Sequence, residues 1–205
     1  MGMFSSETFR KLVVANVIDT LKNMLSFLVM VLFVVVIAAF DFDYYAWNVV
    51  LVINAFSMFI LALVRGFELP KYVRYGVARH IYFKSMVVSS LFDSVVFSVS
   101  LLVIQGAIGG QSILAMANNF QIFVVLILIL MVSYAFGACA AFVWQRFGWK
   151  IGVVCSVILG TGLSNLNLTW MFDLFLITVL LSGVFTVIVF VGSYFFARDI
   201  SIKVK

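Results

Sequence analysis

Apolar stretches of membrane-spanning length recur along most of this chain. A helix needs ~20 apolar residues to cross the hydrocarbon core of a bilayer. The sequence offers six such stretches, the fifth of them short, at about residues 24–40, 46–64, 85–104, 120–144, 151–164 and 172–197. They leave almost no chain for a globular domain, so the sequence predicts one all-α polytopic membrane domain over residues 1–205.

Composition excludes the ordinary soluble classes. The chain is 65% hydrophobic and only 10% charged, and a soluble domain of this length needs far more charge to cover its surface. With one histidine in the chain, no His/Cys cluster with metal-ligand spacing is present, and we expect no metal site.

The basic residues are confined to alternate connections between the spans. All 13 Lys and Arg residues lie in the N-terminal segment, the loop after span two, the loop after span four or the C-terminal tail. The other three loops contain Asp41, Asp43 and Asp173 as their charged residues. Positive charge marks the cytoplasmic side, so we expect a multi-pass protein of the plasma membrane with both termini in the cytoplasm. The net charge of +5 is then a topology signal, and we expect no nucleic-acid partner.

The N-terminal segment has the pattern of an amphipathic helix. Ser and Thr residues stand ahead of an apolar pattern, as they do at helix starts. One helical side then carries Phe9, Leu12, Val13, Asn16, Val17 and Thr20. We interpret residues 5–22 as a connector helix lying along the inner membrane surface. The alternative is that these residues extend span one into the cytoplasm.

The loop between spans two and three is the one long polar stretch in the chain. It is basic and aromatic, and it contains the single proline, Pro70, and the single histidine, His80. Pro70 disfavours helix at Leu69 and can serve in the first turn of a new helix. One interpretation is an ordinary positive-inside loop with interfacial tyrosines; the other is a binding site for a partner protein.

The sequence of this loop resembles the corresponding loop in a known protein family. The run Arg74-Tyr75-Gly76-Val77-Ala78-Arg79, followed by Tyr82-Phe83, resembles the loop between spans two and three in permease subunits of type-2 ABC exporters, in particular small bacterial, Gram-positive-like forms with six spans. The resemblance implies that residues 70–84 form a cytoplasmic coupling helix that docks on an ATPase subunit. The residues it implies for this contact are Lys71, Arg74, Tyr75, Gly76, Val77, Arg79, His80, Tyr82 and Phe83.

The resemblance also implies a function and partners. The chain would export an amphipathic or hydrophobic cargo such as a peptide, an antimicrobial peptide, a lipid or a drug, and would pair with a second permease. ATP and Mg²⁺ would bind the partner ATPase, because this chain has no Walker-type loop and no motif of a catalytic site. We therefore expect a transport subunit among membrane lipids, with no cofactor of its own and no enzyme activity. Two alternatives remain: a substrate-binding subunit of an energy-coupling-factor vitamin transporter, and a membrane immunity protein without transport.

Polar residues at membrane depth are the candidates for the transport path. Asp93 lies near the middle of span three, and an acid at that depth is a functional candidate. The serines around it are Ser89, Ser90, Ser94 and Ser98. They face either a cavity or a neighbouring helix with which they form hydrogen bonds. Because no basic residue is expected at that depth, we predict a protonated Asp93 bonded to serines or to backbone.

Rows of small residues predict close contacts between helices. Ser133, Gly137 and Ala141 form such a row on span four, and Ser156 with Gly160 starts another on span five. Small residues at this spacing let two helix backbones approach within a membrane.

Overall fold

The described part of the chain is helical. The computed structural model describes residues 7–21, 45–108, 119–150, 153–154 and 175–198. The helices are an N-terminal helix (residues 7–21) and the four long helices α2 (Tyr45–Arg74), α3 (Arg79–Ile108), α4 (Asn119–Phe147) and α7 (Phe175–Arg198). The predicted span at 24–40 and nearly all of that at 151–164, with Ser156 and Gly160, lie outside the described residues.

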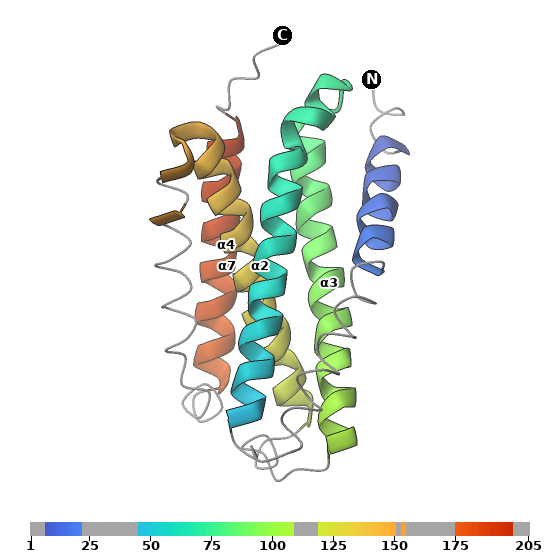
Figure 1. Ribbon diagram of the computed structural model, residues 1–205, viewed down its shortest axis with the longest axis vertical. Helices are drawn as coiled ribbons and strands as arrows, with labels where there is room; N and C mark the ends of the chain where they lie inside the picture. Colours follow the sequence, from blue (N-terminus) through green and yellow to red (C-terminus); the bar gives the residue numbers. More distant parts are fainter. Residues whose placement is uncertain (1–6, 22–44, 109–118, 151–152, 155–174, 199–205) are drawn as a thin grey trace.

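The four long helices run side by side as a bundle (Figure 1). Each contains a segment long and apolar enough to cross a membrane. Large apolar side chains remain uncovered on the outside of the bundle, above all on α7, where Leu176 is 74% and Leu180 66% exposed. Such a surface suits lipid and not water. The helices indicate a membrane-embedded protein, and the all-α expectation is confirmed.

Small residues bring α2 and α4 together. A Cβ atom added to Gly137 of α4 would collide with the carbonyl oxygen of Phe59 on α2 and lie 2.9 Å from the Cβ of Ala62. A Cβ atom on Gly66 of α2 would collide with that of Ala141 on α4. Ala141 and Ser133 are fully buried. Gly137 and Ala141 of the predicted row therefore lie at a close contact between α2 and α4.

The prediction that a new helix begins at Pro70 is wrong. α2 continues through Pro70 and ends at Arg74, and α3 begins at Arg79. Gly76 has a φ of 83° in the turn between them, a conformation that glycine adopts without strain. The segment 70–84 thus forms one end of a helical hairpin, with the last turn of α2 on one side and the first turns of α3 on the other.

Hydrogen bonds from neighbouring helices explain why α2 passes through a proline. Pro70 has no N–H, so the carbonyl of Gly66, four residues earlier, lacks its donor within the helix. The Gln145 side chain of α4 supplies that donor, with its Nε2 2.8 Å from the Gly66 oxygen. One residue earlier, the Arg65 carbonyl accepts a hydrogen bond from the hydroxyl of Tyr82 on α3 at 2.5 Å. Adjacent helices satisfy backbone groups around a proline within a membrane in this way.

A double-mutant cycle tests this role of Gln145. We expect Gln145→Leu to lower the free energy of unfolding by ~0.6–1.7 kcal/mol, the range for hydrogen bonds between membrane helices. In the Pro70→Ala background the loss should be much smaller, because the substituted alanine supplies the missing N–H to the Gly66 carbonyl. Unfolding in detergent micelles measures both values, and equal losses in the two backgrounds would contradict the role.

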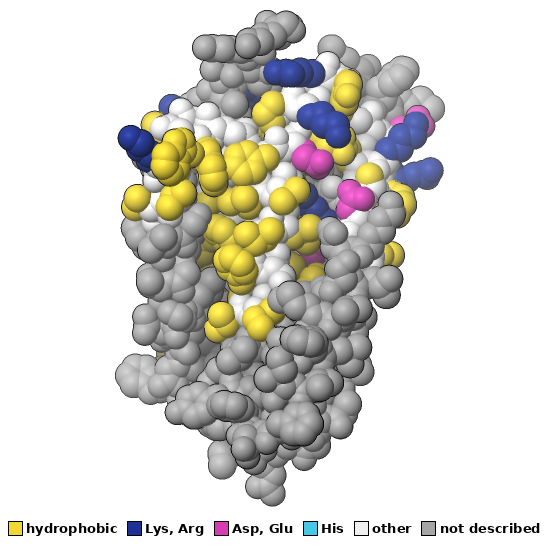
Figure 2. All heavy atoms as spheres, viewed as in Figure 1, with side chains coloured by type: hydrophobic (Ala, Val, Ile, Leu, Met, Phe, Trp, Pro, Cys, Tyr) yellow, Lys and Arg dark blue, Asp and Glu magenta, His cyan; other side chains and the backbone are white. Residues whose placement is uncertain are grey.

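Charged side chains gather at the hairpin end of the bundle (Figure 2). The start of the N-terminal helix, the α2–α3 turn and the last residues of α4 and α7 all lie at this end (Figure 1). The predicted basic connections that the structure describes therefore share one side of the bundle.

The N-terminal helix forms as predicted, but its orientation differs from the prediction. It runs alongside the spans and does not lie across their ends (Figure 1). Two of its polar side chains, Asn16 and Thr20, are buried against α2 and α3. The cause of this orientation is a set of buried polar contacts that the sequence pattern does not show. The alternative, in which these residues extend span one into the cytoplasm, stays untested because residues 22–44 lie outside the described part of the chain.

Candidate functional site: an ion pair shared by four helices

A buried ion pair lies at the centre of the described structure. The guanidinium of Arg65 on α2 contacts the Oδ2 atom of Asp93 on α3. Arg65 is 3% exposed and Asp93 is fully buried. Both lie within segments apolar enough to span a membrane. Charges at such depth are expensive unless they are paired, so the pair is a candidate functional element.

The prediction that Asp93 has no basic partner at its depth is wrong. The sequence pattern assigns Arg65 to the cytoplasmic loop, but α2 continues past it to Arg74. At ~1.5 Å per residue, Arg65 lies ~13 Å below the hairpin end of α2, and Asp93 lies ~21 Å below the start of α3. The long arginine side chain covers the difference. Helix periodicity within one span gives no signal of this pairing, because the partner lies on the other arm of the hairpin.

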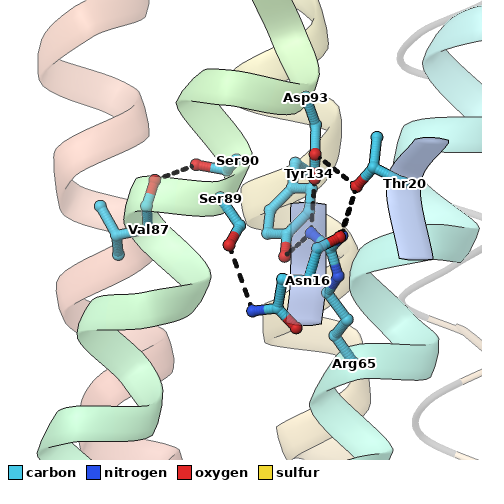
Figure 3. Close-up of polar contacts among 8 residues, drawn as sticks. All are labelled: Asn16, Thr20, Arg65, Val87, Ser89, Ser90, Asp93 and Tyr134. Atoms are coloured by element: carbon cyan, nitrogen blue, oxygen red, sulfur yellow. Dashed lines mark hydrogen bonds and ion pairs between the residues drawn. The ribbon is translucent and has the colours of Figure 1, made fainter. Parts of the chain in front are cut away.

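Four helices converge on the Arg65 guanidinium (Figure 3). Its Nη1 atom contacts Asp93 and lies 3.1 Å from the hydroxyl of Tyr134 on α4. Its Nη2 atom donates to the carbonyl of Asn16 at 2.8 Å and to the hydroxyl of Thr20 at 2.6 Å, both on the N-terminal helix. A planar guanidinium offers donors in two directions, and here each direction serves different helices. We name Asn16, Thr20, Arg65, Ser89, Asp93 and Tyr134 the polar cluster.

The carboxylate of Asp93 also has two partners. Its Oδ2 atom contacts Arg65, and its Oδ1 atom lies 2.6 Å from the Thr20 hydroxyl. The same hydroxyl lies 2.8 Å from the Asn16 carbonyl, and its one hydrogen serves one acceptor at a time. The carboxylate is the stronger acceptor because it is charged. Both oxygens of Asp93 are thus satisfied by side chains from other helices.

The serines near Asp93 differ in their partners. Ser89 accepts a hydrogen bond from the Asn16 side chain at 3.1 Å, and Ser90 donates to the Val87 carbonyl of its own helix. Ser94 and Ser98 are fully buried, and their hydroxyls have no hydrogen-bond partner in the structure as described. Asp93 and Ser89 therefore fit the interhelical-bonding alternative. Ser94 and Ser98 stay candidates for a transport path.

The residues predicted to contact an ATPase fall into two groups. The exposed group lies at the hairpin tip, which we define as residues 71–80: Lys71, Arg74, Tyr75, Gly76 and His80, with Val77 and Arg79 half-buried beside them. Tyr82 and Phe83 lie below the tip. Tyr82 is fully buried, and Phe83 packs against Phe142, Phe190 and Tyr194. The structure thus places the predicted aromatic pair in the interior of the bundle.

Arg79 has a contact of its own at the base of the tip. Its guanidinium donates to the carbonyl of Arg198, the last residue of α7. Carbonyls at the end of a helix lack donors within the helix, and a basic side chain supplies one. Arg79 therefore joins the start of α3 to the end of α7.

The polar cluster provides one arginine, one acid, one phenol, hydroxyls and an amide. The described residues contain no group of His, Cys, Asp and Glu side chains that could hold a metal ion. The arrangement can fix helix positions and separate charges within the membrane. A scan against protein-family models, a search of curated proteins and a search of solved structures each found no match for this chain.

Proposed function

We propose that this chain is the permease subunit of a type-2 ABC exporter. The supporting observation is the geometry of the hairpin tip. Tyr75 is 74% exposed, and the exposed Lys71, Arg74 and His80 surround it at the charged end of the bundle. Exposed tyrosine and arginine side chains suit the centre of a protein interface. Below the tip, Tyr82 and Phe83 fix both arms of the hairpin in the core.

A tip on a rigid base suits transmission of force. A partner bound at Tyr75 would move α2 and α3 together, because Tyr82 joins the two helices through the Arg65 carbonyl. The energy would come from ATP and Mg²⁺ bound by the partner, and this chain would act without catalysis of its own. The proposed cargo is amphipathic or hydrophobic, since the spans offer apolar surface with a few hydroxyls such as Ser94 and Ser98.

The proposed setting is the plasma membrane with the charged end in the cytoplasm. The support is that the described basic connections lie at one end of the bundle, as the positive-inside rule requires of cytoplasmic segments. A second permease copy and membrane lipid would cover the exposed apolar surface of α7.

Purification from native membranes tests the partner. We expect an ATP-hydrolysing chain to co-purify with the wild-type protein and to be lost from the double variant Arg74→Glu, Tyr75→Ala. Substitutions of exposed side chains usually change the free energy of unfolding by ~0.5 kcal/mol or less, so the variant should remain folded. Mass spectrometry identifies the partner, and the ATPase activity of the eluate quantifies it.

The matched control is Lys150→Glu, which reverses an exposed charge beyond the end of α4 and outside the tip. It should retain the ATPase. Retention by the tip variant as well would reject this docking site. Absence of any ATPase from the wild-type eluate would reject the exporter assignment.

A further inference from the structure

The contact of the N-terminal helix with the spans is mainly polar. Its fully buried or nearly buried side chains are Asn16 at 3%, Thr20 at 0% and Leu12 at 6% exposure. Val14, Ile18 and Leu21 are each 45–52% exposed on its outer side. The helix thus buries two polar side chains against the spans and leaves three large apolar side chains exposed, beside its exposed charged residues.

Arg65 joins this helix to the ion pair through two hydrogen bonds, and Thr20 adds a direct bond to Asp93. Its Nη1 atom serves Asp93 and Tyr134, and its Nη2 atom serves Asn16 and Thr20. Loss of the Nη2 contacts would leave Asp93 paired. The N-terminal helix also bonds to α3 through Thr20–Asp93 and Asn16–Ser89, and of these polar contacts only the Nη2 bonds depend on the second branch of Arg65.

Stability alone gives no reason for this ion pair. A buried pair is often no more stabilising than apolar side chains of similar volume, and its best-attested use is to fix one arrangement against others. The exposed side chains Val14, Ile18 and Leu21 suit contact with lipid, so part of the outer side of this helix does not depend on protein neighbours.

We propose that Arg65 is a positioning residue that holds the N-terminal helix against α2 and α3, and that release of its Nη2 contacts frees this helix while the four described spans stay packed. The proposal does not depend on the transport function. It makes the N-terminal helix a movable element of the fold.

The test separates the two directions of the guanidinium. Arg65→Lys keeps a positive charge beside Asp93 but has no second branch for Asn16 and Thr20. Arg65→Leu combined with Asp93→Leu removes the whole pair without leaving a single charge. Thr20→Val removes one acceptor of the Nη2 atom, together with the hydroxyl that donates to Asp93, at nearly constant size. Each variant is made with Cys139 and Cys155 replaced by alanine.

Spin labels report the helix position in lipid nanodiscs. One label pair at Arg10 and Lys84, both exposed, measures the N-terminal helix against α3. A control pair at Lys84 and Lys150 measures α3 against the end of α4. Double electron–electron resonance then gives the distance distribution of each pair. We expect a single narrow Arg10–Lys84 distance in the parent protein, a broad or shifted one in Arg65→Lys and in the double leucine variant, and partial broadening in Thr20→Val.

The control pair should stay unchanged in every variant. Narrow, unshifted Arg10–Lys84 distances in both Arg65 variants would overturn the proposal, because other contacts would then hold the helix. Broadening of the control pair as well would also overturn it, since Arg65 would then support the whole bundle. Broadening in the double variant alone would overturn it too, by showing that Asp93, and not the second branch of Arg65, positions the helix.

Discussion

Arg65→Leu should destabilise this protein far more than Arg65→Leu and Asp93→Leu together. The single change leaves a carboxylate buried without its cation, and such a break lowers the free energy of unfolding by ~3–5 kcal/mol. The double change leaves no unpaired charge and fills the space with apolar atoms, so we expect a stability within ~1 kcal/mol of the parent. Thr20 can then donate to the Asn16 carbonyl, which already lies 2.8 Å away.

Reversible unfolding in mixed micelles measures these differences. Lys84→Leu provides the control for loss of a basic residue on the same hairpin, because Lys84 is exposed and a surface change alters stability by ~0.5 kcal/mol or less. Equal losses in the single and double variants would show that the two residues do not act as a pair.

Gly137→Leu should have the second large effect, through packing and not through charge. Any Cβ at this position meets the backbone oxygen of Phe59, and a backbone atom of α2 cannot turn away as a flexible side chain can. Overpacking of this kind costs ~1–3 kcal/mol, and we expect the upper end of that range because α2 and α4 must separate along their contact. The measurement is the midpoint of thermal unfolding, with the fraction of monodisperse protein after purification.

Gly183→Leu is the matched control on α7. Apart from the adjacent residues and nearby backbone of its own helix, no atom lies within 4 Å of a Cβ built on Gly183, so the larger side chain meets open space. We expect unchanged or slightly higher stability there, since leucine is a better helix former than glycine. Similar losses at both glycines would mean that the effect belongs to glycine in a helix and not to the α2–α4 contact.

The sequence predicts those parts of the fold that depend on one segment at a time. Apolar length locates α4 and α7 to within three residues at each end, and the spacing of small residues locates Gly137 at a helix contact. Each of these signals is contained in a single helix. They follow from the thickness of the bilayer and from the 3.6-residue period.

The candidate site depends on contacts between segments, and the sequence does not predict these. The pattern places Arg65 in a loop because a charge usually ends a span, yet Asp93 and Thr20 satisfy it within the bundle. The basic and aromatic residues next to Tyr82 in the sequence predict that it contacts a partner protein, yet its hydroxyl donates to the Arg65 carbonyl inside the bundle. Pro70 is expected to start a helix because a proline inside a helix leaves one carbonyl without its donor. Here Gln145 of α4 supplies that donor, which the sequence of α2 alone does not show.

The proline in α2 has a mechanical consequence. At Gly66 the backbone of α2 is joined to α4 by a side-chain amide, and at Arg65 to α3 by a phenol. A rotation of the hairpin tip at Tyr75 would therefore be transmitted to α3 and α4 at this level, before it reached the remainder of α2. The axis about which the hairpin rotates is then set by α3 and α4. It lies at the level of Arg65, the residue proposed to position the N-terminal helix.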